Sequence, residues 1–157
     1  MLKVNTKSPA FTLPDGSGKS VSLTDFRGKT VVLYFYPRDL TPGCTIEAQQ
    51  FQQYLKAIRA TGAEVIGISK DPPERHRKFA EQCALTFPLL SDVDGKVIEA
   101  YGVWQKKWLY GKSFLGIARV TYLIGPDGMI EKVFPKVSPK THAEAVLAAL
   151  TEAQKQK

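Results

Sequence analysis

The residue with the greatest chemical potential in this chain is Cys44, because a thiol becomes a strong nucleophile once it loses its proton. It follows Thr41-Pro42-Gly43, and threonine then proline is typical of the N-cap and first position of a helix. The free N–H groups and the dipole at a helix start favour a thiolate. Burial of the sulfur has the opposite effect, since it disfavours charge. A space-filling cysteine is therefore the alternative, and a nearby cation decides between the two.

Three further residues are candidates to act with this cysteine. Arg119 is the candidate cation, because it opens an otherwise apolar strand, although an exposed arginine at a strand start is the alternative. Glu47 lies one helical turn after Cys44 and could orient the guanidinium group, or it could be a solvated carboxylate. As N-cap, Thr41 is expected to aim its hydroxyl at the N–H of Cys44, which also brings the hydroxyl beside the sulfur.

The elements that position Cys44 can be recognised on both sides of it. Val31–Tyr36 is rich in β-branched and aromatic residues and predicts a buried strand. Pro37 ends that strand, since proline has no N–H to donate. The following helix carries an apolar stripe that, extended backwards, includes Cys44: Ala48, Phe51, Leu55 and Ile58. The cysteine is thus expected to point inward from the first turn of a helix that follows a buried strand.

The rest of the chain predicts an α/β domain. Further strands are expected at Glu64–Ser69, within Leu85–Leu90, and on both sides of the Gly125–Gly128 turn. A helix is expected whose apolar stripe is His76, Phe79, Ala80 and Cys83, and a second one that follows the Asp92–Gly95 turn and runs through Tyr101. A terminal helix is expected from Thr141 to about Ala153, with Ala145, Val146, Ala149 and Leu150 on one face. The segments Phe11–Leu13 and Lys19–Leu23 predict an N-terminal β-hairpin, and residues 102–116 a long loop. This order indicates a single domain, residues 1–157, with a central mixed β-sheet flanked by helices, which is a thioredoxin-like architecture.

The residues around Cys44 also carry a family resemblance. Pro37, Thr41 and Cys44, at their spacing, resemble the peroxidatic signature of the peroxiredoxins. Thr45, Glu47 and Ala48 extend it in the manner of the bacterioferritin-comigratory, or Q-type, branch. Segments that resemble this branch follow in the same order along nearly the whole chain, among them 87–92 and 119–124. The resemblance implies a thioredoxin-like fold and a thiol-dependent peroxidase that reduces hydrogen peroxide and small organic hydroperoxides without a metal or an organic cofactor.

The same resemblance implies a role for each matching residue. Cys44 would be the peroxidatic cysteine, which becomes a sulfenic acid and is recycled by thioredoxin or a similar thiol reductant. Thr41 would hydrogen-bond the peroxide, and Arg119 would hold the thiolate and the polarised peroxide, a task that suits its fixed fork of donors. Pro37 would shield the pocket from water.

A second cysteine leaves the resolving step open. Many Q-type members have a cysteine five residues after the first, where this chain has Gln49. Some carry it on the next helix instead, and Cys83 lies in the last turn of that helix. Cys83 is thus a possible resolving cysteine. It also shares an apolar stripe with Phe79, so a packing residue, with an external thiol resolving Cys44, is the alternative.

Composition limits the other function classes. The net charge is +7, but the basic residues are spread along the chain and no nucleic-acid-binding motif accompanies them. No apolar run is long enough to span a bilayer and no leader is recognisable, so a cytoplasmic protein without membrane partners is expected. Two histidines and two cysteines without ligand spacing do not predict a metal site. A monomer is expected rather than a stable oligomer.

Two other thiol functions are alternatives to a peroxidase. A general thiol–disulfide oxidoreductase expects Cys-x-x-Cys, and Thr45-Ile46-Glu47 after Cys44 does not supply it. A peroxide sensor or holdase would use the same cysteine without sustained turnover.

Overall fold

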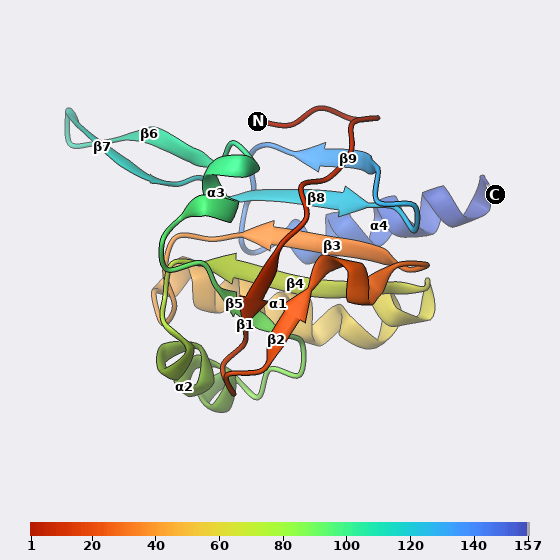
Figure 1. Cartoon of the computed structure of the whole chain (residues 1–157), viewed down its shortest axis with the longest axis horizontal. Helices are drawn as coiled ribbons and strands as arrows, with labels where there is room; N and C mark the ends of the chain where they lie inside the picture. Colours follow the sequence, from red (N-terminus) through yellow and green to blue (C-terminus); the bar gives the residue numbers. More distant parts are fainter. Residues whose placement is uncertain (157) are drawn as a thin grey trace.

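The computed structural model describes residues 1–156, and its centre is a five-stranded mixed sheet (Figure 1). The strand order is β5-β4-β3-β8-β9. The central strand β3 (Thr30–Phe35) pairs in parallel with β4 (Ala63–Ser69) and antiparallel with β8 (Val120–Ile124). Beyond them lie β5 (Leu89–Ser91), parallel to β4, and β9 (Ile130–Phe134), antiparallel to β8. The mixed sheet expected from the order of elements is confirmed.

Helices lie on both faces of this sheet. The long helix α1 (Pro42–Ala60) and the C-terminal helix α4 (His142–Lys155) lie behind it in the view of Figure 1. Helix α2 (Pro73–Cys83) packs on the same apolar core as these two. The short helix α3 (Lys96–Ala100) and the 3-10 turn η1 (Leu23–Phe26) lie on the front face. This is the thioredoxin-like α/β fold that the sequence predicted.

The side chains of β3 explain why it is the centre of the molecule. They alternate between the two faces, so Tyr34 packs with Phe51 of α1, while Phe35 packs with the core that contains Ile98 of α3. A strand that is buried on both faces needs a continuous apolar run, and residues 31–36 supply it.

Two hairpins extend the core. The N-terminal hairpin, β1 (Thr12–Pro14) with β2 (Ser20–Ser22), was predicted and is confirmed. The prediction of a loop over residues 102–116 is wrong, because β6 (Trp104–Leu109) and β7 (Lys112–Ile117) form an antiparallel hairpin that projects from the body (Figure 1). The residues at its tip, Tyr110 and Gly111, have φ angles of 52° and 76°, as a tight type I′ turn requires.

The terminal helix differs from its predicted face in one respect. Ala145 is exposed, and the buried residues of α4 are His142, Ala143, Val146 and Leu150. The buried stripe begins at His142, the first residue of the helix, so the buried face is rotated by part of a turn from the predicted one. Among residues 1–156, no helix combines the length and apolar character that crossing a membrane requires.

Candidate active site

The site is built where β3 ends and α1 begins. The buried Tyr36 follows the last residue of β3, and Pro37, half-buried, directs the chain into a short loop. Thr41 is the N-cap of α1, with extended backbone angles, and its carbonyl oxygen accepts from the N–H of Thr45 at 2.9 Å. The predicted contact of its hydroxyl with the N–H of Cys44 is wrong. The hydroxyl instead donates to the carbonyl oxygen of Arg38 at 2.9 Å, which uses its only hydrogen.

Cys44 meets Arg119 at this point. Its side chain is only 1% exposed, and Nη1 of Arg119 donates to Sγ at 3.3 Å. Strand register explains the meeting, because Phe35 at the end of β3 pairs with Val120, which puts Arg119 beside the segment that leads to the helix. A Cβ atom on Gly43 would lie 3.0 Å from Nη2 of Arg119, so glycine at that position allows the guanidinium group to approach.

Glu47 completes the polar cluster. Its side chain is 1% exposed, and Oε1 accepts from Nη1 of Arg119 at 2.9 Å, so the carboxylate is buried rather than solvated. Burial raises the pKa of Glu47 from 4.5 to about 7, although the charge of Arg119 lowers it. For Arg119, burial lowers the pKa, but the charges of Cys44 and Glu47 outweigh burial and the pKa is raised. The guanidinium group therefore stays charged between two acidic partners.

The raised pKa of Glu47 predicts a pH-dependent stability. Between about pH 4.5 and about pH 7 the unfolded chain loses a proton from Glu47 that the folded chain keeps. The free energy of unfolding therefore falls as pH rises through this range. The change is on the order of 3 kcal/mol. In Glu47→Gln this loss of stability should be missing, so the variant gains stability relative to the wild type as pH rises from about 4.5 to about 7. Urea unfolding of both proteins measures this; a constant difference would mean that Glu47 stays ionised throughout.

Cys83 lies apart from this cluster, at the last residue of α2. It is half-buried, and Nε2 of Gln49 lies 3.9 Å from its sulfur. Gln49 is five residues beyond Cys44, which corresponds to about 7.5 Å along a helix. Burial raises the pKa of the Cys83 thiol, and the contact with Gln49 lowers it by less. Both cysteines are free thiols.

Lys107 was missed by reasoning from the sequence, which put it in a solvated loop. It is half-buried on β6, and burial together with the charge of Arg119 lowers its pKa, while the Cys44 sulfur opposes this shift. Strand β6 therefore brings a second cation toward the site. Residues 104–109, Trp-Gln-Lys-Lys-Trp-Leu, do not alternate apolar and polar side chains, so the sequence held no strand signal that could have found it.

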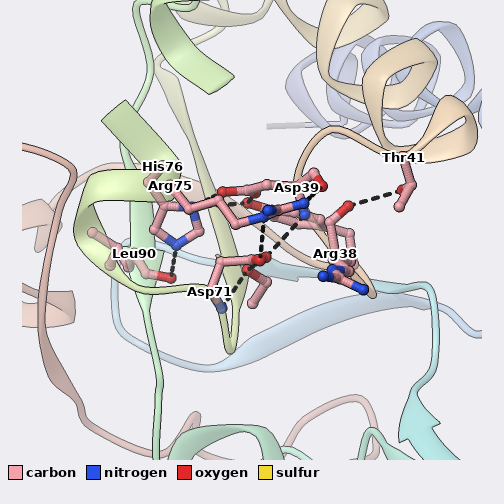
Figure 2. A network of polar contacts seen from close by, with 9 residues as sticks. Arg38, Asp39, Thr41, Asp71, Arg75, His76 and Leu90 are labelled. Atoms are coloured by element: carbon pink, nitrogen blue, oxygen red, sulfur yellow. Dashed lines mark hydrogen bonds and ion pairs between the residues drawn. The ribbon is translucent and has the colours of Figure 1, made fainter. Parts of the chain in front are cut away.

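A group of polar residues next to the site was also missed. Asp39 is fully buried in the loop before Thr41, and it contacts His76 of α2, for which no role beyond the core was expected (Figure 2). The signal for Asp39 was its position, a carboxylate between a buried strand and a helix start.

A thioredoxin-like fold with an arginine-bound cysteine in the first turn of a helix defines a thiol-based redox protein. Comparison with known proteins gives the family. Residues 4–133 match the AhpC/TSA family, and the chain belongs to it.

The curated relatives and solved structures described next belong to the bacterioferritin-comigratory, or Q-type, branch that the motif resembles. The chain is 44% identical to peroxiredoxin Bcp of Escherichia coli K12 over 151 residues, 96% of this chain and 97% of that protein. It is 45% identical to a putative peroxiredoxin bcp of Coxiella burnetii over 149 residues, 95% of this chain and 99% of the relative. A cysteine-to-serine mutant of Xylella fastidiosa PrxQ has a TM-score of 0.92 at 32% identity, with 98% of each chain covered. Xanthomonas campestris bacterioferritin comigratory protein has a TM-score of 0.86 at 38% identity, with 92% of each covered.

Proposed function

We propose that Cys44 is the peroxidatic cysteine of this peroxiredoxin, a thiol-dependent peroxidase. The observation that carries the assignment is the buried contact of 3.3 Å between its sulfur and Nη1 of Arg119, at the start of α1. The helix start and the guanidinium group both stabilise negative charge on sulfur. They also provide positive charge where the cleaved peroxide bond leaves a negative oxygen.

The first step follows from this arrangement. The Cys44 thiolate attacks the terminal oxygen of the hydroperoxide, the O–O bond breaks, and the departing oxygen leaves as an alkoxide or hydroxide that takes up a proton. Cys44 becomes a sulfenic acid, oxidised by two electrons, and the peroxide becomes an alcohol or water. Arg119 holds both the thiolate and the departing charge, and Glu47 orients Arg119 through their contact at 2.9 Å.

Thr41 and Pro37 have supporting roles in the proposal. The Thr41 hydroxyl uses its hydrogen on the carbonyl oxygen of Arg38, so it is left as an acceptor for the O–H of the peroxide. Pro37, half-buried beside the loop, excludes water from the sulfur. The substrates proposed are hydrogen peroxide and small organic hydroperoxides, which agrees with the alkyl peroxide reduction activity described for the Xanthomonas campestris relative.

Cys83 is the proposed resolving cysteine. Its thiol attacks the sulfenic acid, an S–S bond forms, and water leaves. A disulfide needs Cβ atoms about 3.5–4.5 Å apart, so the first turn of α1 must unwind to bring Cys44 toward α2. The end of α2 is suited to open as well, because Ala84 has a left-handed φ of 51°, which costs a non-glycine residue about 1 kcal/mol or more.

Replacing Cys83 with serine tests this step. We expect one equivalent of peroxide to give a Cys44–Cys83 cross-link in monomeric wild-type protein and to leave sulfenic or sulfinic acid at Cys44 in Cys83→Ser. Peptide mapping by mass spectrometry identifies both products, and Cys44→Ser is the control that forms neither. If Cys83→Ser turns over as fast as the wild type with thioredoxin, Cys83 is a packing residue and an external thiol resolves Cys44.

The remaining parts of the proposal concern the setting of the reaction. Residues 1–157 would act as one domain, as a cytoplasmic monomer, with thioredoxin or a similar dithiol protein as the reductant. Peroxiredoxins among the relatives favour catalysis over a sensor or holdase that uses the cysteine once. Steady-state consumption of peroxide with thioredoxin, its reductase and NADPH distinguishes these, because only a peroxidase consumes many equivalents.

A further inference from the structure

Asp39 is the centre of a buried polar network beside the site (Figure 2). Its carboxylate accepts from the hydroxyl of Tyr36 at 2.5 Å and lies 2.6 Å from Nδ1 of His76. Its backbone N–H donates to Asp71 at 2.9 Å, and its carbonyl oxygen accepts from Nη2 of Arg75 at 2.9 Å. Every polar atom of Asp39 therefore has a partner, and three of the four partners belong to α2 or to the turn before it.

The contact between Asp39 and His76 holds one proton. Nε2 of His76 lies 3.0 Å from the carbonyl oxygen of Leu90, which can only accept, so Nε2 carries a hydrogen. Nδ1 faces a carboxylate oxygen at 2.6 Å, and a hydrogen must lie between these two atoms. Whichever of them holds it, the pair has no net charge, which is how two ionisable groups can both be fully buried.

The network is built for hydrogen bonding rather than for a metal ion. Asp39, Asp71 and His76 present ligand atoms within 4.8 Å of one another, which is a spacing that a cation could use. Each of these atoms already has a hydrogen-bonding or charged partner, and Arg75 brings positive charge to 3.0 Å from Asp71. A cation would have to break these contacts and lie beside a guanidinium group.

The residue after Asp39, Leu40, has an unusual backbone conformation that the network stabilises. Leu40 has a φ of 66°, in the left-handed region that a leucine rarely adopts. Such a conformation costs about 1–3 kcal/mol and persists only where neighbouring contacts impose it. Leu40 joins Asp39, which is fixed on all sides, to Thr41, the N-cap of α1. Its backbone thus sets where Thr41 and the first turn of the helix lie.

We propose that Asp39 and His76 are positioning residues of the peroxidatic site. Through their buried contact they hold the 38–41 loop, with Leu40 in its left-handed conformation, so that Thr41 and Cys44 face Arg119. The proposal rests on Cys44 being the peroxidatic cysteine. It assigns no contact with substrate to either residue, and it makes the N-terminus of α2 the anchor of the catalytic loop.

The test measures the rate of Cys44 oxidation by hydrogen peroxide in single turnover, followed by mass spectrometry. In Asp39→Ala we expect this rate to fall by about 10- to 100-fold, because small displacements of reacting groups have effects of this size. In Tyr36→Phe, which removes one hydrogen bond to Asp39 and keeps the ring, we expect a smaller fall, and this variant decides the matter if Asp39→Ala does not fold. Oxidation of Cys44 by peroxide is first measured in the wild type. If the wild type does not react, the proposed function fails, and this outcome is distinct from failure of the positioning role in the variants.

Two further variants separate positioning from general stability. Tyr122→Phe removes a buried hydroxyl that donates to the carbonyl oxygen of Tyr101 on the opposite face of the sheet, so it should lower the melting temperature and leave the rate unchanged. Leu40→Gly removes the penalty of the left-handed conformation, so adding it to Asp39→Ala should restore at least part of the rate. The proposal is wrong if folded Asp39→Ala or Tyr36→Phe reacts at the wild-type rate, if Tyr122→Phe is equally slow, or if Leu40→Gly restores nothing.

Discussion

Replacing Cys44 with serine is expected to reduce peroxide consumption by several orders of magnitude, to the rate without protein. A serine hydroxyl keeps its proton at neutral pH and is a weak nucleophile without a base, so it cannot attack the O–O bond. Serine nearly matches cysteine in volume and can still accept from Arg119, so the fold should be kept. Loss of about 1 kcal/mol would lower the melting temperature by about 2–4 °C.

The control for this variant is Cys83→Ser, which retains Cys44 and should retain the first oxidation step. Single-turnover oxidation, steady-state turnover with thioredoxin and circular dichroism of both variants give the comparison. Substantial turnover in folded Cys44→Ser would falsify the assignment of Cys44.

Replacing Arg119 with methionine is expected to have the second largest effect. Methionine keeps much of the length of the side chain but removes the donor at 3.3 Å from the Cys44 sulfur and the partner of Glu47. Loss of one such stabilising group costs about 10²–10³-fold in rate. Lysine keeps the charge without the fork of donors, so Arg119→Lys should lose less.

The rate of peroxide attack on Cys44, followed in single turnover, measures this effect. The rate should fall in Arg119→Met, because both the Cys44 sulfur and the departing oxygen lose the donor that stabilises their negative charge. The matched comparison is Lys107→Met, which removes a cation from the β6–β7 hairpin that has no hydrogen bond to the sulfur among the residues described. An unchanged rate in Arg119→Met would remove Arg119 from the site.

Local sequence determined the position of the nucleophile. A run of β-branched and aromatic residues, a proline that ends it, and a threonine-proline pair that starts a helix are signals within a few residues of one another, and each can be recognised without knowing any distant contact. The helical stripe that runs from Cys44 to Ile58 then required the sulfur to face the core, and it is buried there. The thioredoxin-like order of elements followed from the same kind of local pattern.

Tertiary structure alone decided what surrounds the sulfur. Arg119 is 75 residues from Cys44 and meets it only because β8 pairs with β3 in one register. Glu47 could have been solvated, and packing against Arg119 made it a buried acid. Asp39 and His76, 37 residues apart, have no local pattern that would join them. Contacts between distant segments depend on how sheets and helices assemble, so residue spacing specifies the nucleophile, while the folded chain specifies its electrostatic environment and the loop that holds it.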